Sequence, residues 1–146
     1  MNAGNFLNST SLLEETFFEN AVIFITEYNE KGAMGFVVNK EFPRKLNELE
    51  EFKNIKPFSL YEGGPVDQEH LYFVHRRPDL ITGGTPVTDN ILLGGDFKAA
   101  VYYINNGTLT EKDIKIFIGY CGWDYEELDE EVAEGSWQVR ETGTVF

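Results

Sequence analysis

The sequence is short of cysteine, of histidine and of long hydrophobic runs. It has one cysteine, Cys121, and two histidines among 146 residues. A single thiol excludes an intrachain disulfide and is typical of proteins in a reducing compartment. No apolar run reaches the roughly 18 residues that a membrane span requires. The N-terminal residues lack the basic and apolar regions of a signal peptide. We therefore expect a cytoplasmic protein without membrane association.

Basic residues are also scarce, at 12 Lys and Arg against 25 Asp and Glu, for a net charge of −13. Their only clusters are the pairs Arg44-Lys45 and Arg76-Arg77. Nucleic-acid binding draws much of its free energy from cations that replace counterions on phosphates. A chain this acidic, without a long basic run, argues against direct contact with DNA or RNA. Proteins or small molecules remain as the expected partners.

Hydrophobic residues are plentiful, at 42% of the chain with 12 Phe and 7 Tyr. This content excludes a disordered chain and suffices for a core. No repeat, low-complexity tract or linker interrupts the sequence, so we expect one domain over residues 1–146.

Apolar, β-branched runs predict several strands. Residues 20–40 read as a hairpin, because two such runs flank a turn-forming segment that ends at Gly32. The runs are continuously apolar, which predicts strands covered on both faces. Further strands are expected at residues 57–61, 70–75, 87–93, 114–118 and 137–139.

Three helices are expected between these strands. Leu46, Leu49 and Phe52 have helical spacing over residues 44–52. Asp96 can cap a helix over residues 97–105, which Asn106-Gly107 would end. Asp124 can cap a last helix that runs to Val132. Strands dominate without regular βαβ alternation, which predicts an α+β fold.

Two glycine pairs and the thiol are the candidate chemical sites. Gly63-Gly64-Pro65 and Gly94-Gly95-Asp96 could be anion loops, but neither has the spacing of a phosphate-binding motif. Backbone turns explain both more simply. Cys121 would need a neighbouring base to act as a nucleophile, and the sequence places neither His70 nor His75 beside it. Neither histidine has a sequence-local carboxylate or serine that would define a triad. We expect Cys121 to be a small buried residue and name no catalytic residue.

Carboxylates recur at helical spacing near the C-terminus, as in Glu127/Glu131 and Glu130/Glu134. Such pairs repel weakly, and a hard cation could relieve the repulsion. A solvated helix face is the simpler interpretation, so we expect neither a metal nor a cofactor.

The ordered motifs resemble those of the YqgE/AlgH family of small bacterial proteins. They are Gly32-Ala33-Met34-Gly35-Phe36-Val37-Val38-Asn39, Gly63-Gly64-Pro65-Val66, the strand ending at His75, and Gly119-Tyr120-Cys121-Gly122-Trp123 followed by Glu127 to Glu131 and Trp137. The resemblance implies a curved, branched, mostly antiparallel sheet or partial barrel flanked by a few helices. It implies no established activity, although some members are labelled transcriptional regulators.

The chain departs from the family pattern at four positions. Tyr28 stands where histidine is usual, Asp124 where glycine is usual, Glu127 where glutamine is usual, and Cys121 where alanine is frequent. A family function that needs the amide would therefore be altered at Glu127.

Two hypotheses follow. The first is a non-catalytic regulatory or protein-binding module that acts without touching DNA. The second is an enzyme or small-ligand binder with a pocket near Asn39, His75, Tyr120 and Trp123. The candidate ligand or partner surface comprises Asn39, Gly63, Gly64, Pro65, His75, Tyr120, Trp123, Glu127 and Glu131.

Overall fold

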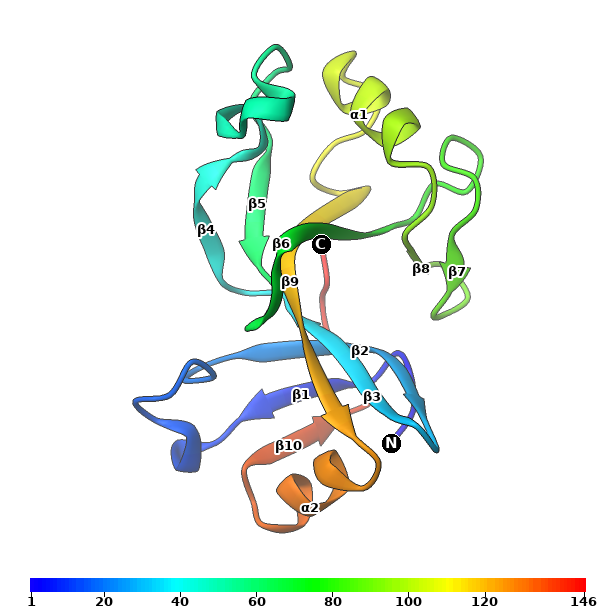
Figure 1. Ribbon diagram of the computed structural model, residues 1–146. Coiled ribbons are helices and arrows are strands. Elements are labelled where there is room, and N and C mark those ends of the chain that lie inside the picture. Colours follow the sequence, from blue (N-terminus) through cyan, green and yellow to red (C-terminus); the bar gives the residue numbers. More distant parts are fainter.

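The computed structural model describes residues 1–146. Ten strands form one branched sheet that does not close into a barrel (Figure 1). The strands are β1 (Phe6–Ser9), β2 (Val22–Asn29), β3 (Gly32–Val37), β4 (Glu41–Lys45), β5 (Ser59–Glu62), β6 (Val66–His75), β7 (Thr85–Pro86), β8 (Leu92–Leu93), β9 (Ile114–Asp124) and β10 (Trp137–Arg140). The helices are α1 (Phe97–Asn105) and α2 (Glu127–Ala133), with 3-10 turns η1 (Ser11–Leu13), η2 (Leu46–Glu48) and η3 (Glu50–Phe52). The α+β class is confirmed.

Strand β9 is shared by two parts of the sheet. Its first half pairs antiparallel with β6 and parallel with β5, while residues 121–124 pair with β3. We call the region of β10, β1, β2, β3 and α2 the lower lobe, and that of β4 to β8 and α1 the upper lobe, after their places in Figure 1. All pairings except β5–β9 are antiparallel. The curved, branched, mostly antiparallel sheet is therefore confirmed.

Three glycines allow β9 to cross beneath the turn that precedes β6. Gly119 has φ +72°, and a Cβ on it would lie 2.4 Å from the carbonyl oxygen of Gly64. A Cβ on Gly64 would lie 2.1 Å from the carbonyl of Tyr120, and one on Gly63 2.5 Å from the oxygen of Gly119. Only glycine permits backbones to approach so closely. The strand expected to stop at residue 118 thus continues through this crossing to Asp124.

The hydrophobic residues form three clusters. Ile23 and Ile25 of β2 point into the cluster of the lower lobe, whereas Phe24 points into a central cluster. In that central cluster Phe36 stacks on Phe117, with ring centroids 4.6 Å apart. The predicted hairpin and the burial of both faces of β2 are confirmed.

Helix α1 also has the predicted bounds and cap. The Asp96 carboxylate accepts a hydrogen bond from the N–H of Ala99 at 3.2 Å. Ala100 and Ile104 are buried against the cluster of the upper lobe. At nine and seven residues, α1 and α2 are both too short to cross a membrane.

Three expectations about local structure were wrong. Residues 44–52 form the end of β4 and two 3-10 turns, because the N–H of Leu46 pairs with the Phe58 carbonyl and ties this segment to the sheet. Residues 87–93 contribute only β8, since the Thr88 hydroxyl accepts the N–H of Ile91 and closes a turn. Asp124 does not cap α2, because β9 runs through it and Glu126 precedes the helix with φ +65°.

Candidate functional site

The apolar groove

A groove of about 530 Å³ opens on the upper lobe. Its floor is apolar and comprises Phe42, Leu49, Phe52, Leu71, Phe97 and Ile118. Its rim is polar and comprises Arg44, Glu50, Glu51, Gln68, Glu69 and His70. We call this feature the apolar groove.

The floor consists of the outer layer of the upper core. Ile118 of β9 is 8% exposed, and the other five floor residues are only partly buried against the same cluster. Phe52 of η3 meets Phe97 of α1 edge to face, with centroids 5.7 Å apart. Because β4, η3, β6 and α1 each contribute an apolar side chain, the groove exists only when distant parts of the chain have packed together.

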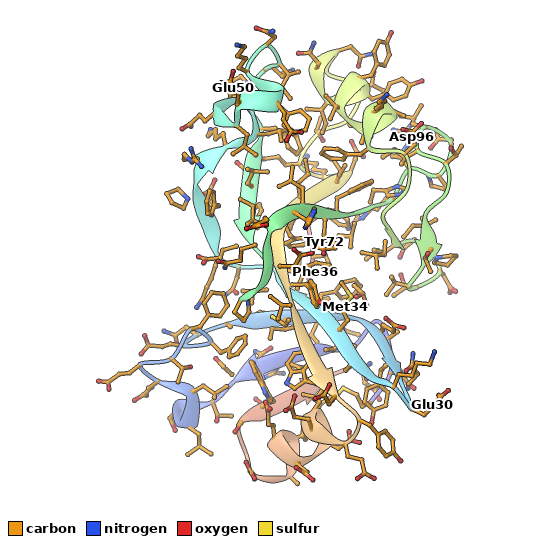
Figure 2. The ribbon with its side chains drawn as sticks, in the orientation of Figure 1. Glu30, Met34, Phe36, Glu50, Tyr72 and Asp96 are labelled. Atoms are coloured by element: carbon orange, nitrogen blue, oxygen red, sulfur yellow. The ribbon has the colours of Figure 1, made fainter.

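The rim is exposed and carries more negative than positive charge. Glu50, Glu51 and Glu69 are exposed, as is Arg44. Figure 2 shows Glu50 at the end of the upper lobe that lies farthest from the lower lobe. Any molecule in the groove would therefore meet phenyl and alkyl groups below and mainly carboxylates above.

An Asp–His pair lies beside this rim. Asp67 Oδ1 is 2.6 Å from His70 Nδ1, and the Tyr72 hydroxyl donates to the other oxygen of Asp67. Asp67 has φ +52°, which is uncommon for a residue other than glycine. It lies in an irregular part of β6, where pairing with β9 is interrupted between Val66 and Leu71. His70 therefore has a carboxylate partner, although no serine or thiol is bonded to its ring to define a triad.

These contacts shift the titration of all three groups. The bond from Tyr72 lowers the pKa of Asp67 and raises the pKa of Tyr72 to about 12. The bond to Asp67 raises the pKa of His70. The sequence does place Asp67 three residues before His70. In a regular strand these two side chains would point to opposite faces, and only the irregular part of β6 brings them within hydrogen-bond distance.

Positions of the expected site residues

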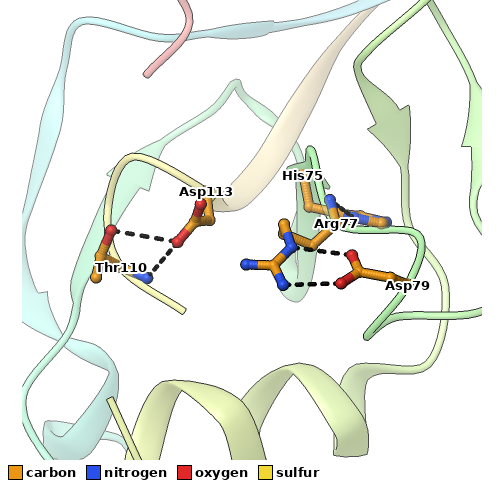
Figure 3. Close-up of polar contacts among 5 residues, drawn as sticks. All are labelled: His75, Arg77, Asp79, Thr110 and Asp113. Carbon is orange, nitrogen blue, oxygen red and sulfur yellow. Dashed lines mark hydrogen bonds and ion pairs between the residues drawn. The ribbon is translucent and has the colours of Figure 1, made fainter. Parts of the chain in front are cut away.

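His75 is fully buried, and both ring nitrogens are engaged; Figure 3 shows its contact with Arg77. Nδ1 accepts the N–H of Arg77 at 3.1 Å, so Nε2 carries the proton that is donated to the Gly94 carbonyl at 3.0 Å. Burial lowers the pKa of His75. The side chain ties the end of β6 to the loop after β8. Next to it, the guanidinium of Arg77 forms a two-pronged ion pair with Asp79.

Asn39 and the glycine–proline turn lie near the junction of the lobes. The Asn39 side chain accepts the N–H of Val22 at 2.9 Å and donates to the Asn20 carbonyl at 2.8 Å. Gly63 and Gly64 are buried in the crossing with β9, which accounts for them without a phosphate. Pro65 is exposed beside them.

Tyr120 is half-buried and packs edge to face on Tyr72, with centroids 5.4 Å apart. Figure 2 shows Tyr72 beside Phe36, at the junction of the two lobes. Tyr72 links Tyr120 to Asp67, because its ring contacts Tyr120 and its hydroxyl donates to the Asp67 carboxylate. Tyr120 is thus an expected residue that approaches the Asp–His pair, through the Tyr72 ring.

Trp123, Glu127 and Glu131 belong to the lower lobe. The indole N–H of Trp123 donates to Glu131 Oε1 at 3.1 Å. The Glu127 carboxylate accepts the N–H of Asp124 at 3.3 Å, close to the start of α2. Asn39, His75, Tyr120 and Trp123 thus have separate partners, and none of the four main pockets is lined by any of them.

Cys121 is 1% exposed, and its thiol donates to the Gly63 carbonyl at 3.3 Å. Burial raises the pKa of Cys121 to about 12. A thiol that stays protonated is a poor nucleophile. Cys121 is the small buried residue that the sequence indicates.

Comparison with known proteins

The sequence model of the AlgH-like family matches residues 6–145. Similar curated proteins carry the name UPF0301 protein. The one from Bacteroides thetaiotaomicron is 35% identical over 137 residues, which cover 93% of this chain and 69% of the relative. The one from Chlorobium limicola is 36% identical over 135 residues, covering 92% of this chain and 72% of the relative.

Two solved structures share the fold. The solution structure of the AlgH protein from Pseudomonas aeruginosa superposes with a TM-score of 0.76 at 22% identity, covering 97% of this chain and 77% of that one. A crystal structure of a protein from Corynebacterium diphtheriae has a TM-score of 0.78 at 20% identity, covering 98% and 77%. The family match over nearly all residues and the shared fold agree, and the chain belongs to the AlgH-like family.

Proposed function

We propose that the protein is a non-catalytic interaction module that binds a segment of another protein in the apolar groove. The observation that carries this proposal is the groove itself, in which partly exposed phenyl and alkyl groups are surrounded by a polar rim. Concave sites lined mainly by apolar and aromatic side chains, with a few polar groups at the edge, are typical of binding sites. The regulatory label of some family members would then reflect control through a protein partner.

The titratable groups favour binding over catalysis. His75 and Cys121 are buried and hydrogen-bonded within the fold. His70 is exposed and paired with Asp67, but no hydroxyl or thiol nucleophile is hydrogen-bonded to its other nitrogen. The arrangement lacks the nucleophile and base contact that covalent catalysis uses.

Selection from a random peptide display library tests this proposal. Peptides that bind the immobilised protein are measured by fluorescence anisotropy against the wild type, Leu49→Asp and the control Leu12→Asp. Leu49 lies on the groove floor, whereas Leu12 is 63% exposed on η1. We expect Leu49→Asp to weaken binding at least about tenfold, which corresponds to about 1.4 kcal/mol. The control should bind as the wild type does.

A second measurement does not depend on the fold of a variant. It follows the changes in the backbone amide NMR chemical shifts of the wild-type protein when a selected peptide is added. Shifts that cluster on η3, β4, β6 and the start of α1 support the proposal. A library that yields no peptide tighter than about 100 μM, or shifts confined to the lower lobe, would overturn it.

Direct DNA contact is tested separately by titration with random duplex DNA. The net charge of −13 leads us to expect no binding even at low salt. Tight binding that weakens steeply with salt would contradict the charge argument.

A small apolar ligand in the same groove is the second candidate. The volume of about 530 Å³ falls in the range of small-molecule sites. Native mass spectrometry of the purified protein would detect such a ligand as an added mass, which Leu49→Asp should remove.

A further inference from the structure

The charges around the apolar groove indicate what kind of segment it accepts. Three carboxylates, Glu50, Glu51 and Glu69, line the rim with one permanent cation, Arg44. Of the carboxylates, only Glu50 has an ion-pair partner, Lys53 at 3.1 Å, and that pair is exposed. Glu51 and Glu69 have none within the chain. The rim therefore offers unpaired negative charge beside an apolar floor.

His70 does not reverse this balance. Its Nδ1 is held 2.6 Å from Asp67, so the positive charge of the protonated ring is matched by a carboxylate in direct contact. The whole chain adds to the local effect, because its net charge of −13 attracts cations at long range.

The floor suits an apolar anchor and tolerates a cation close by. Phe42, Phe52 and Phe97 contribute three aromatic rings. Aromatic rings bind apolar side chains through buried area and attract ammonium or guanidinium groups over their faces. An acidic segment would instead bring its carboxylates next to Glu51 and Glu69, and like charges in contact oppose binding.

We propose that the groove accepts a cationic segment of a partner protein, in which one bulky apolar anchor is flanked by lysine or arginine. This inference rests on the proposed function, because it names the partner chemistry of the same groove. The anchor would contact the phenyl floor, and the flanking cations would lie against Glu51 and Glu69. Charge complementarity of this kind raises the association rate and selects the partner.

Three synthetic peptides of about 12 residues test the inference. They share one central Leu-Trp anchor, flanked in turn by lysine, glutamine or glutamate, carry one terminal fluorescein, and are titrated with the protein by fluorescein anisotropy at low salt. We expect the lysine peptide to bind at least about tenfold tighter than the glutamine peptide, and the glutamate peptide to bind most weakly. Raising the salt to about 0.5 M should reduce the difference between the peptides, since exposed charges are screened.

Matched charge reversals locate the effect. Glu51→Lys with Glu69→Lys changes the rim, while Glu30→Lys with Glu134→Lys makes the same change in net charge elsewhere. Glu30 lies at the tip of the β2–β3 turn, at the opposite end of the molecule from Glu50 (Figure 2). The rim variant should lose the preference for lysine, and the control should retain most of it.

The outcomes separate the two proposals. If the lysine and glutamine peptides bind equally and the groove still binds library peptides, the inference fails and the proposed function stands. If both double variants lose the preference for the lysine peptide equally, the net charge of the protein and not the rim determines that preference. This result would also overturn the inference. If no peptide binds the groove, the proposed function itself fails.

Discussion

The indole N–H groups of Trp123 and Trp137 donate to the same oxygen, Oε1 of Glu131, at 3.1 and 2.9 Å. The two rings are nearly perpendicular, with centroids 6.3 Å apart. Trp123 belongs to β9 and Trp137 begins β10, whereas Glu131 is in α2 between them. One carboxylate oxygen therefore holds the helix to both strands.

We expect Glu131→Ala to destabilise the protein by roughly 2–4 kcal/mol, because it leaves two largely buried indole N–H groups without an acceptor. Glu131→Gln retains an acceptor oxygen and should cost about half as much. Urea unfolding followed by tryptophan fluorescence measures both, with Glu134→Ala on the exposed end of α2 as the control. Equal unfolding midpoints for Glu131→Ala and the control would show that the shared acceptor contributes nothing.

Gly64→Ala should prevent folding or cost more than about 3 kcal/mol, because the added Cβ would lie 2.1 Å from the Tyr120 carbonyl. The matched control is Gly94→Ala. Gly94 has φ +72° but nothing within 4 Å of an added Cβ, so it carries conformational strain without a clash. It should cost only about 1 kcal/mol. Thermal unfolding of the two variants compares them, and similar losses would mean that the crossing can open at little cost.

The two histidines should give stability opposite dependences on pH. Burial lowers the pKa of His75 below the ordinary 6.5, so its contribution is complete above pH 6.5 and is lost as the pH falls toward the lowered value. The bond to Asp67 raises the pKa of His70, so its contribution is complete below 6.5 and is lost as the pH rises through the raised value.

The His70→Gln variant isolates the first effect. Its free energy of unfolding should fall as the pH is lowered from about 7 through the ordinary imidazole pKa of about 6.5. Nitrogen NMR of the wild-type imidazoles at pH 6.5 should show His75 mainly as the neutral Nε2–H tautomer. A His75 ring that titrates at or above 6.5 would contradict the expected desolvation.

Lys115 should give a dependence on alkaline pH. Its ammonium donates to the Val38 carbonyl at 2.9 Å and lies 4.1 Å from the centre of the Tyr61 ring, and burial lowers its pKa from 10.5 to about 8. Between about pH 8 and 10.5 the folded lysine is mostly neutral while the unfolded one is still protonated, so folding releases a proton and becomes more favourable as the pH rises. The stability of the wild type should therefore rise relative to Lys115→Met by about 1–3 kcal/mol.

Urea unfolding of both proteins at several pH values measures this difference. Both proteins contain the same tyrosines, so the effect of tyrosine titration on stability cancels in the difference between the wild type and Lys115→Met. Parallel stability curves for the two proteins would show that Lys115 keeps its ordinary pKa.

Local sequence patterns predicted the elements that local interactions determine. The β2–β3 hairpin follows from two apolar runs around Gly32, and α1 follows from the Asp96 cap and its apolar stripe. Strand β1 was not predicted, because Phe6–Ser9 is only four residues long and is extended through its pairing with β2 and β10. Its signal lies in strands that are distant in sequence.

The groove could not be predicted for the same reason. Phe42, Leu71 and Phe97 are brought together only by the curvature of the upper sheet and the packing of α1. The sequence did indicate that His75, Trp123 and the glycine pair matter, but it could not separate a ligand site from a buried structural role. In the structure each has a partner within the chain.

The pairing of β1 with β10 joins Phe6 to Arg140 and affects how the chain folds during synthesis. The strand pairings of the upper lobe use no residue beyond the middle of β9, so these pairings can form before residues 137–140 are synthesised. The lower lobe cannot, because β1 must wait for the strand that covers its outer edge. Until then that edge is an open template for other chains. The edge of β1 is therefore exposed to aggregation until residues 137–140 have been synthesised and have paired with it.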